Sequence, residues 1–236
     1  MSVDVISAEA LRRVTENTLK VMKANEKYLT DLDAEIGDAD HGINMVRGFG
    51  LVNDRVSSLN SPDVGKILET AGIALMEAVG GAAGPLYGML FIKASAIVRG
   101  KTEINKRDLA ALFEAGLIGV QTIGGGTVPG EKTMVDTLYS VVEALKELAD
   151  DESATLMMAL EKAAEAAREG MKRTISLIAK RGRASYLGER SRGHQDPGAT
   201  SAYLILRTIL DTLNGKVGLK VKNSGPDGVI LEETYI

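Results

Sequence analysis

Cysteine and tryptophan are absent from the 236 residues, which include only 5 prolines and 4% aromatic residues. Without cysteine there is no disulfide framework, no thiolate metal site and no cysteine nucleophile. The composition therefore fits a reducing compartment, and we expect a cytoplasmic protein. Few aromatic residues, together with abundant Ala, Leu, Glu and Lys, favour helix over sheet.

Runs of one charge and long apolar runs are also missing. The formal net charge is −4, and no cluster of Lys and Arg argues for a nucleic-acid partner. The most apolar stretch, residues 71–98, is interrupted by Glu77, Pro85 and Lys93. It therefore predicts two buried helices rather than a membrane span, which needs about 20 uninterrupted apolar residues. Because the N-terminus also lacks the pattern of a signal peptide, we expect no membrane partner.

Apolar residues recur at helical spacing along most of the chain. N-cap residues precede several of these stripes, among them Ser7, Asp63, Asn105 and Asp196. The pattern predicts an all-α fold, an antiparallel up-and-down bundle of one domain over residues 1–214. Its eight helices are expected near residues 7–30, 42–58, 62–80, 85–99, 106–122, 132–149, 153–181 and 197–214. Residues 215–236 are expected to form a short C-terminal extension of unknown role, either two short strands or an ordered tail.

Four connections between these helices are rich in glycine and carry specific polar groups. They follow the first, third, fifth and seventh predicted helices, and alternate loops of an up-and-down bundle lie at the same end. The four loops should therefore meet at one pole. They are GDADHG (37–42), GGAAGPLYG (80–88), GGGTVPGEKT (124–133) and RGRASYLGERSRGHQDPGAT (181–200).

Carboxylates crowd the first of these loops. Asp33, Asp38 and Asp40 lie at the end of the first helix and just after it, where repulsion calls for protonation or a cation. Oxygen ligands select Mg²⁺, Mn²⁺ or Ca²⁺. An EF-hand is excluded, because Ile43 and Phe49 stand at its required Gly and Glu positions. The alternative is a solvated acidic helix end, although carboxylates there oppose the helix dipole.

The other loops offer groups that bind anions. The loop at 124–133 approaches the P-loop pattern, but Glu131 replaces its lysine and a helix precedes it, so it is not a P-loop. Its backbone N–H groups can still bind an anion, and a plain helix connector is the alternative. In the fourth loop, Arg183 is the best candidate for a phosphate contact, whereas Arg190 and Arg192 are expected to pair with Glu189 or face solvent. Together these features predict a site for Mg²⁺ and a nucleoside polyphosphate.

The chain carries four longer motifs: YLTDLDAEIGDADHGINMVRGF, GGAAGPLYG, PGEKTMVDTL and KRGRASYLGERSRGHQDPGATS. With them the sequence resembles the nucleotide-binding L subunit of bacterial dihydroxyacetone kinases, over about residues 8–213. The resemblance implies a barrel of eight antiparallel helices with the nucleotide site at one pole. It also implies a phosphotransferase in which this chain delivers the γ-phosphoryl group of ATP to dihydroxyacetone, held covalently on a separate K subunit.

Roles for particular residues also follow from this resemblance. It implies that Asp33, Asp38 and Asp40 hold two Mg²⁺ ions and that Arg183 is catalytic. Ala83 stands where the family often has serine, so one hydroxyl contact to phosphate is missing. ADP or ATP contacts are implied for His41, Gly42, Ile43, Asn44, Ala82, Ala83, Gly125, Met134, Arg183, Asp196, Pro197 and Gly198.

Three functional interpretations stay open. In the version that depends on the phosphotransferase system, ADP stays bound and an M subunit rephosphorylates it. We favour this version because no K domain is fused to the chain. In the ATP-dependent version, ADP exchanges with ATP and the acceptor can be another small ketose, such as a tetrulose. The third interpretation is a nucleotide-binding regulatory module. A homodimer and a role in glycerol metabolism are further expectations.

Overall fold

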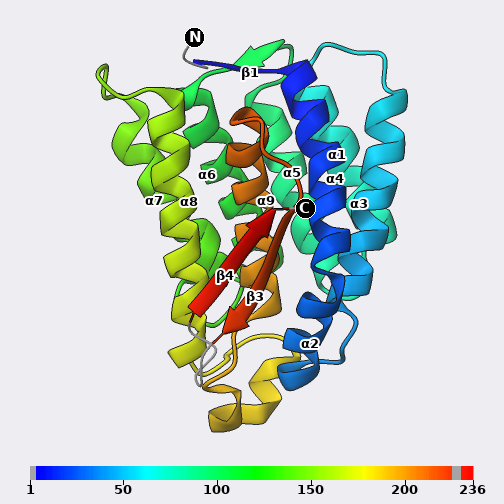
Figure 1. Ribbon diagram of the computed structural model, residues 1–236, viewed down its shortest axis with the longest axis vertical. Helices are drawn as coiled ribbons and strands as arrows, with labels where there is room; N and C mark the ends of the chain where they lie inside the picture. Colours follow the sequence, from blue (N-terminus) through cyan, green and yellow to red (C-terminus); the bar gives the residue numbers. More distant parts are fainter. Residues whose placement is uncertain (1–3, 225–229, 236) are drawn as a thin grey trace.

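The computed structural model describes residues 4–224 and 230–235. Within them the helices form a closed ring, in which α1 packs against α3, each helix from α3 to α8 packs against the next, and α9 packs against both α8 and α1 (Figure 1). The expected helical barrel is thereby confirmed. The helices are α1 (Ala8–Ala24), α2 (Glu26–Ile36), α3 (His41–Ser58), α4 (Val64–Ala78), α5 (Ala83–Ile97), α6 (Lys106–Ile123), α7 (Met134–Ala149), α8 (Leu156–Arg173) and α9 (Pro197–Leu213).

The interior of the ring is filled by the apolar faces of these helices. Phe49 and Tyr87 are among the largest side chains that are almost completely buried there. The predicted N-caps Ser7, Asp63 and Asp196 each accept a hydrogen bond from a backbone N–H in the first turn of α1, α4 and α9. Asn105 forms a full capping box with Asp108 at the start of α6. These caps fix where the helices start and thus which residues the loops contain.

Two predicted helices were wrong in their extent. The first, expected at 7–30, is interrupted at Asn25 and resumes as α2, which continues to Ile36. The Asn25 side chain donates to the carbonyl of Val21 and so competes with the helical hydrogen bonds. The seventh, expected at 153–181, ends at Arg173 and passes into a 3₁₀ turn, η1 (Thr174–Ser176), where the buried Thr174 hydroxyl donates to the Met171 carbonyl.

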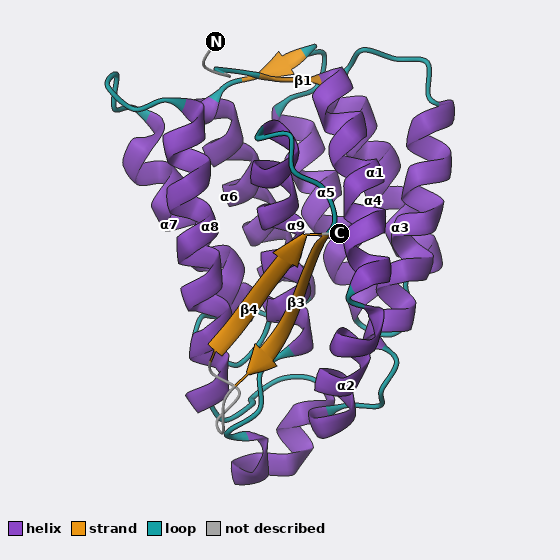
Figure 2. Ribbon diagram, viewed as in Figure 1, coloured by secondary structure: helices purple, strands orange, loops and turns teal. Residues whose placement is uncertain are grey.

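Short strands complete the fold (Figure 2). The antiparallel pair of β1 (Ile6–Ser7) and β2 (Glu103–Ile104) was not predicted, because two residues are too few to show alternation. In the C-terminal extension, β3 (Leu219–Ser224) and β4 (Ile230–Tyr235) pair antiparallel, which confirms the two-strand alternative. The two strands were expected on either side of NSGPDG (223–228), and most of that segment lies outside the described residues.

The β3–β4 hairpin is attached to the barrel by polar contacts. The side chain of Asn25 donates to the Leu219 carbonyl at 2.8 Å and accepts from the Val221 N–H at 2.8 Å, so it holds β3 at the junction of α1 and α2. On the other strand, Glu233 accepts from the Tyr203 hydroxyl and pairs with Arg207, both on α9. The extension therefore joins α9 to the junction of α1 and α2. In the described part of the chain, no helix has both the length and the apolar character needed to cross a bilayer.

Candidate functional site

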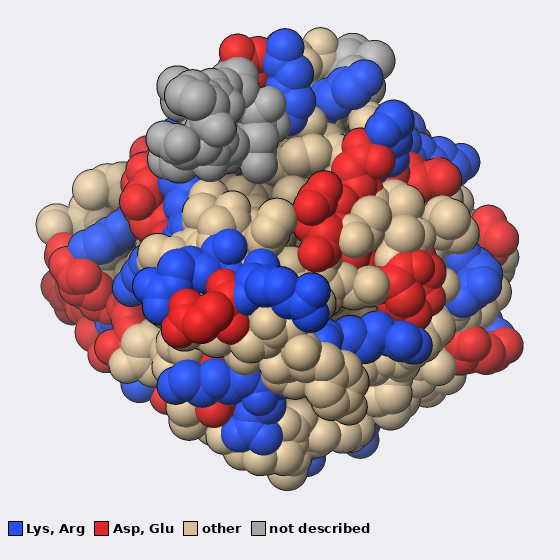
Figure 3. Space-filling model, turned by 90° about the horizontal axis from the view of Figure 1, so that it is seen from below, with Lys and Arg blue, Asp and Glu red and all other residues tan. Residues whose placement is uncertain are grey.

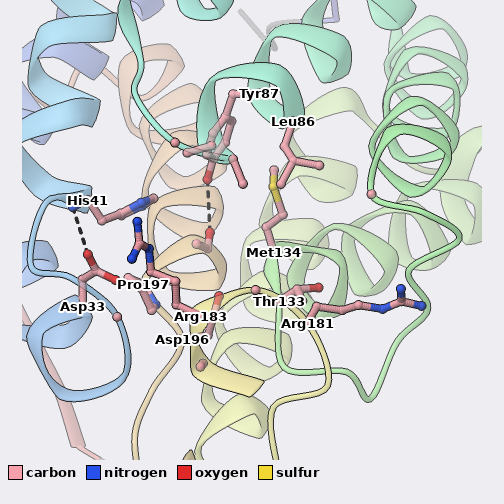
Figure 4. Close-up of a pocket in the computed structure, with 18 of the residues that line it drawn as sticks. Asp33, His41, Leu86, Tyr87, Thr133, Met134, Arg181, Arg183, Asp196 and Pro197 are labelled. Carbon is pink, nitrogen blue, oxygen red and sulfur yellow. Dashed lines mark hydrogen bonds between the residues drawn. The ribbon is translucent and has the colours of Figure 1, made fainter. Parts of the chain in front are cut away.

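The four glycine-rich loops meet at the lower pole of the barrel in Figure 1, as the alternation of helices predicts. Together they line one cavity of about 810 Å³, large enough for a nucleotide-sized ligand (Figure 4). Its wall includes Asp38 from the first loop, Ala82 from the second, Thr127 from the third and Arg183 from the fourth.

Four helices begin at this cavity. The first residues of α3, α5, α7 and α9 are His41, Ala83, Met134 and Pro197, and all four line it. The first N–H groups of a helix have no partner within the helix, and the helix dipole makes this end positive. Four such ends around one cavity create a strong preference for an anionic ligand.

Carboxylates from the end of α2 and from the first loop also line the cavity. One ligand oxygen from each of Asp33, Asp38 and Asp40 lies within 4.8 Å of the others. Asp33 is buried in the last turn of α2 and accepts from the backbone N–H groups of Asp40, at 2.9 Å, and His41, at 3.2 Å. Those two bonds fix the loop that carries the other two carboxylates.

The backbone of this loop is held in an unusual conformation. Ala39, between the two exposed aspartates, has a φ of 61°, in the left-handed region that disfavours residues with a side chain. Gly37 must be glycine, because a Cβ there would lie 2.0 Å from Oδ1 of Asp33. Asp40 occupies the N-cap position of α3 without capping it, so its carboxylate stays available to a ligand. Three convergent oxygen donors of this kind fit Mg²⁺.

Arginines approach the cavity from the fourth loop. Arg183 lines it, and its guanidinium lies 2.9 Å from Oδ2 of Asp38. Arg181 instead pairs with Glu131 at 2.7 Å, and the pKa of that carboxyl is lowered mainly by this contact. Glu131 also accepts from the Val128 N–H. Glu131 thus fastens the third loop to the fourth, a different role from that of the lysine in a P-loop.

A buried polar network links three of the four helix starts. The hydroxyl of Ser201 on α9 lies 2.8 Å from Nε2 of His41 on α3 and 2.7 Å from the hydroxyl of Tyr87 on α5. Tyr87 also donates to the Gly198 carbonyl at 3.1 Å. Burial lowers the pKa of His41, although Asp33 and Asp40 partly oppose this. His41 is therefore neutral, and its bond to Ser201 fixes the position of its ring next to the carboxylates.

Lys132 is a residue that the sequence analysis missed. It lines the cavity, is 1% exposed and has a φ of 63°, so it shares the left-handed conformation of Ala39. Its ammonium donates to the carbonyls of Thr174 and His194 and thereby joins the start of α7 to the fourth loop. Burial lowers the pKa of Lys132 to about 8, against the opposing effect of Asp196. A lysine within a glycine-rich loop is expected at the surface, so only its packing reveals that it is buried.

Most residues implied by the resemblance reach the cavity, and three do not. Gly42 packs against the carbonyl of Glu26, Ile43 is 52% exposed, and the Gly125 carbonyl accepts from Arg181. Their assignment to the nucleotide stays a prediction. Those that line the cavity are Asp33, Asp38, Asp40, His41, Asn44, Ala82, Ala83, Met134, Arg183, Asp196, Pro197 and Gly198. Beyond Lys132, lining residues not foreseen include Leu86, Tyr87, Thr133 and Arg181. Thr133 had a signal, since it and Asp136 make the capping box of α7.

The stability of the metal-free protein is expected to depend on pH through Asp196. Burial raises the pKa of this N-cap carboxyl of α9 from 3.8 to about 7. A carboxyl whose pKa is raised in the folded state does not change the free energy of unfolding at a pH where it is protonated in both the folded and the unfolded state. It lowers that free energy increasingly as the pH rises from about 4 to 7. Asn keeps the cap without the charge. In EDTA, the Tm of Asp196→Asn minus that of the wild type should increase by a few degrees between pH 5 and pH 8.5.

Asp63→Asn makes the same N-cap exchange on α4, outside the cavity lining, and is the matched control. Thermal unfolding followed by circular dichroism measures both variants. An equal Tm difference for Asp196→Asn at the two pH values would contradict burial of an ionised carboxylate at this cap.

Comparison with known proteins decides the family, because residues 35–211 match the DAK2 domain. The chain belongs to the DAK2 domain family. This DAK2 chain is 42% identical to "PEP-dependent dihydroxyacetone kinase, ADP-binding subunit DhaL" of Escherichia coli K12, over 80% of this chain and 89% of the relative. It is 39% identical to "PEP-dependent dihydroxyacetone kinase 2, ADP-binding subunit DhaL" of Listeria innocua, over 92% of this chain and the whole relative.

The fold of the DAK2 chain is also similar to a solved structure. The crystal structure of the dihydroxyacetone kinase from C. freundii in complex with AMP-PNP and Mg²⁺ matches with a TM-score of 0.63 and 24% identity. The match covers 85% of this chain and 33% of the C. freundii chain, so the DAK2 chain spans about a third of that protein.

Proposed function

We propose that this chain is the ADP- and ATP-binding subunit of a dihydroxyacetone kinase, a phosphotransferase that presents a Mg²⁺–nucleotide to dihydroxyacetone held on a separate K subunit. The observation that carries the proposal is one cavity that combines three carboxylates, four helix N-termini and Arg183. A cavity lined by carboxylates alone would repel a polyphosphate. The same carboxylates attract it once a divalent cation lies between them.

The two Mg²⁺ ions would be held by Asp33, Asp38 and Asp40. When bound, they would neutralise the negative charge of the phosphates. The chain's own groups do the rest. The starts of α3, α5, α7 and α9 bind and orient the phosphates, while the apolar side chains of Leu86 and Met134 exclude water from the cavity. Arg183 stabilises the charge that develops on the transferred phosphoryl group. No side chain of this chain has to act as nucleophile, because the acceptor hydroxyl comes from the sugar on the partner.

The phosphoryl donor in this proposal is an M subunit of the phosphotransferase system, which would rephosphorylate bound ADP. Support comes from the DhaL relatives of Escherichia coli and Listeria innocua, which are named as PEP-dependent. The alternative donor is free ATP, with dihydroxyacetone or another small ketose as acceptor. The regulatory module, the homodimer, the cytoplasmic location and the division into residues 1–214 and 215–236 stay predictions.

Mass spectrometry of the native protein tests the first step. We expect a mass increment for ADP and Mg²⁺ that EDTA removes. The purified chain is then mixed with its K subunit and dihydroxyacetone, and dihydroxyacetone phosphate is measured with either ATP or phosphoenolpyruvate and the phosphotransfer proteins. Product that forms with phosphoenolpyruvate and the phosphotransfer proteins, but not with ATP, supports the proposal. Product that forms with ATP alone supports the alternative donor. Nucleotide binding without product in either mixture would favour the interpretation of the chain as a regulatory module.

A further inference from the structure

An aromatic side chain stands fully in solvent beside the cavity. Tyr186 is 88% exposed, which is more than any other large apolar or aromatic side chain in the described residues. It belongs to a short 3₁₀ segment, η2 (Arg183–Ser191), whose first residues Arg183 and Ala184 line the cavity. Tyr186 therefore lies two residues beyond the cavity wall and does not itself belong to it.

The segment that carries Tyr186 is rigidly built. Gly182, with a φ of 61°, and Gly188, with a φ of 55°, set the turns at its start and within it. Ser185 bonds back to the Gly182 carbonyl through both its N–H, at 3.2 Å, and its hydroxyl, at 2.7 Å. The buried hydroxyl of Ser191 donates to the Gly188 carbonyl and accepts from the Ala179 N–H. The segment also packs on α2, which carries Asp33. Such a fixed segment loses little entropy when it docks to a partner.

The surroundings of Tyr186 are basic, although the whole chain is acidic. Residues 180–192 contain five basic residues and one acidic residue, while the formal net charge of the chain is −4. Figure 3, which looks at this pole from below, shows Lys and Arg side chains gathered in a band across it. Arg190 is exposed, and none of the described acidic residues forms an ion pair with it. This surface suits a partner whose facing rim is acidic.

A second exposed apolar group borders the cavity. Val128, in the third loop, is 50% exposed and follows the cavity residue Thr127. Buried aromatic anchors within a charged rim are typical of the residues that dominate the energy of protein interfaces. Neither Tyr186 nor Val128 contributes to the packing of the barrel, because neither belongs to the buried core.

We propose that Tyr186, with Arg190 beside it, is the docking anchor for the subunit that holds the acceptor sugar. This inference rests on the proposed function. Phosphoryl transfer between two subunits requires the reacting atoms to approach to about 3–3.5 Å, so the acceptor subunit must come to the mouth of this cavity. Tyr186 fills an apolar pocket near the sugar site of that subunit, and Arg190 pairs with acidic groups at its rim.

The test measures the affinity of the chain for its K subunit by surface plasmon resonance in the presence of Mg²⁺ and ADP. We expect Tyr186→Ala to weaken it about 30-fold, the loss typical of an aromatic anchor, and Tyr186→Phe to keep most of it. In the coupled assay, the KM for the K subunit should rise while kcat at saturating K subunit stays near that of the wild type. Tyr139→Ala is the control, since Tyr139 is a 42% exposed tyrosine on α7. Arg190→Glu should lower the association rate and weaken its dependence on salt.

Binding of Mg²⁺–ADP and the Tm are measured for each variant, because Tyr186 touches neither the cavity nor the core, and both values should stay unchanged. A photoreactive phenylalanine at position 186 provides a second measurement and should crosslink to the K subunit. Unchanged K-subunit affinity in Tyr186→Ala, or a crosslink to a second copy of this chain, would overturn the docking proposal. A wild type that binds no nucleotide or transfers no phosphoryl group would instead overturn the proposed function.

Discussion

Alanine in place of Asp38 or Asp40 is expected to abolish Mg²⁺-dependent nucleotide binding while the protein stays folded. Each substitution removes one of three convergent oxygen ligands, and the remaining two cannot complete the cradle. Loss of even an outer-shell partner of a metal site costs about 10–100-fold, so loss of a ligand should weaken Mg²⁺–ADP at least 100-fold. Isothermal titration calorimetry with ADP, with and without Mg²⁺, measures the effect.

Folding should be little affected, because both residues lie in an exposed loop and the single ion pair of Asp38 with Arg183 is largely solvated. Asp31→Ala is the matched control, since Asp31 is an exposed aspartate on α2 that pairs with Lys27. It should bind Mg²⁺–ADP as the wild type does. Tight, metal-dependent ADP binding by Asp38→Ala and Asp40→Ala, with helicity unchanged, would refute the metal assignment.

Arg183→Ala is expected to reduce phosphoryl transfer far more than nucleotide binding. The guanidinium of Arg183 lies 2.9 Å from Oδ2 of Asp38, a carboxylate that we propose would hold Mg²⁺. An arginine that stabilises the transferred phosphoryl group is worth about 10³-fold or more in kcat, whereas an exposed ground-state contact contributes little. We therefore expect kcat to fall by about 10³ and the Kd for Mg²⁺–ADP to change by less than about 5-fold.

The control for Arg183 is Arg173→Ala, which removes an exposed arginine at the end of α8, outside the cavity lining. Single-turnover transfer from ATP bound to the chain to dihydroxyacetone on the K subunit separates the chemical step from nucleotide exchange. Arg183→Lys keeps the charge but not the planar fork and should recover only part of the rate. Small and equal effects of Arg183→Ala on rate and binding would remove Arg183 from the transfer step.

The sequence predicted correctly those features that depend on the order of the helices or on residues close together in the chain. The alternation of helices was sufficient to bring the four glycine-rich loops to one pole, because short connections leave an antiparallel bundle little choice. The carboxylates were equally visible, since Asp33, Asp38 and Asp40 repel one another within eight residues. The N-cap residues Ser7, Asp63, Asn105 and Asp196 marked helix starts correctly because the capping bond is local.

Features that depend on distant contacts were not visible. At the break between α1 and α2, Asn25 also bonds to Leu219 and Val221, almost two hundred residues away, and no local pattern contains these bonds. Lys132 looked like a solvated lysine, yet its ammonium is buried by the carbonyls of two other segments. The early end of α8 depends in part on Thr174, whose hydroxyl also accepts from the Asp196 N–H. In each case tertiary packing overrides a local propensity.

The clamp at Asn25 has a consequence for how the protein is made. Residues 25 and 219 are separated by 194 positions, so the hydrogen bonds that join the α1–α2 junction to β3 can form only after the ribosome has completed the whole ring of helices. Closing so long a loop is slow compared with pairing neighbouring helices. The helix starts around the cavity are thus synthesised before the segment that fastens the junction of α1 and α2, the helix that carries Asp33.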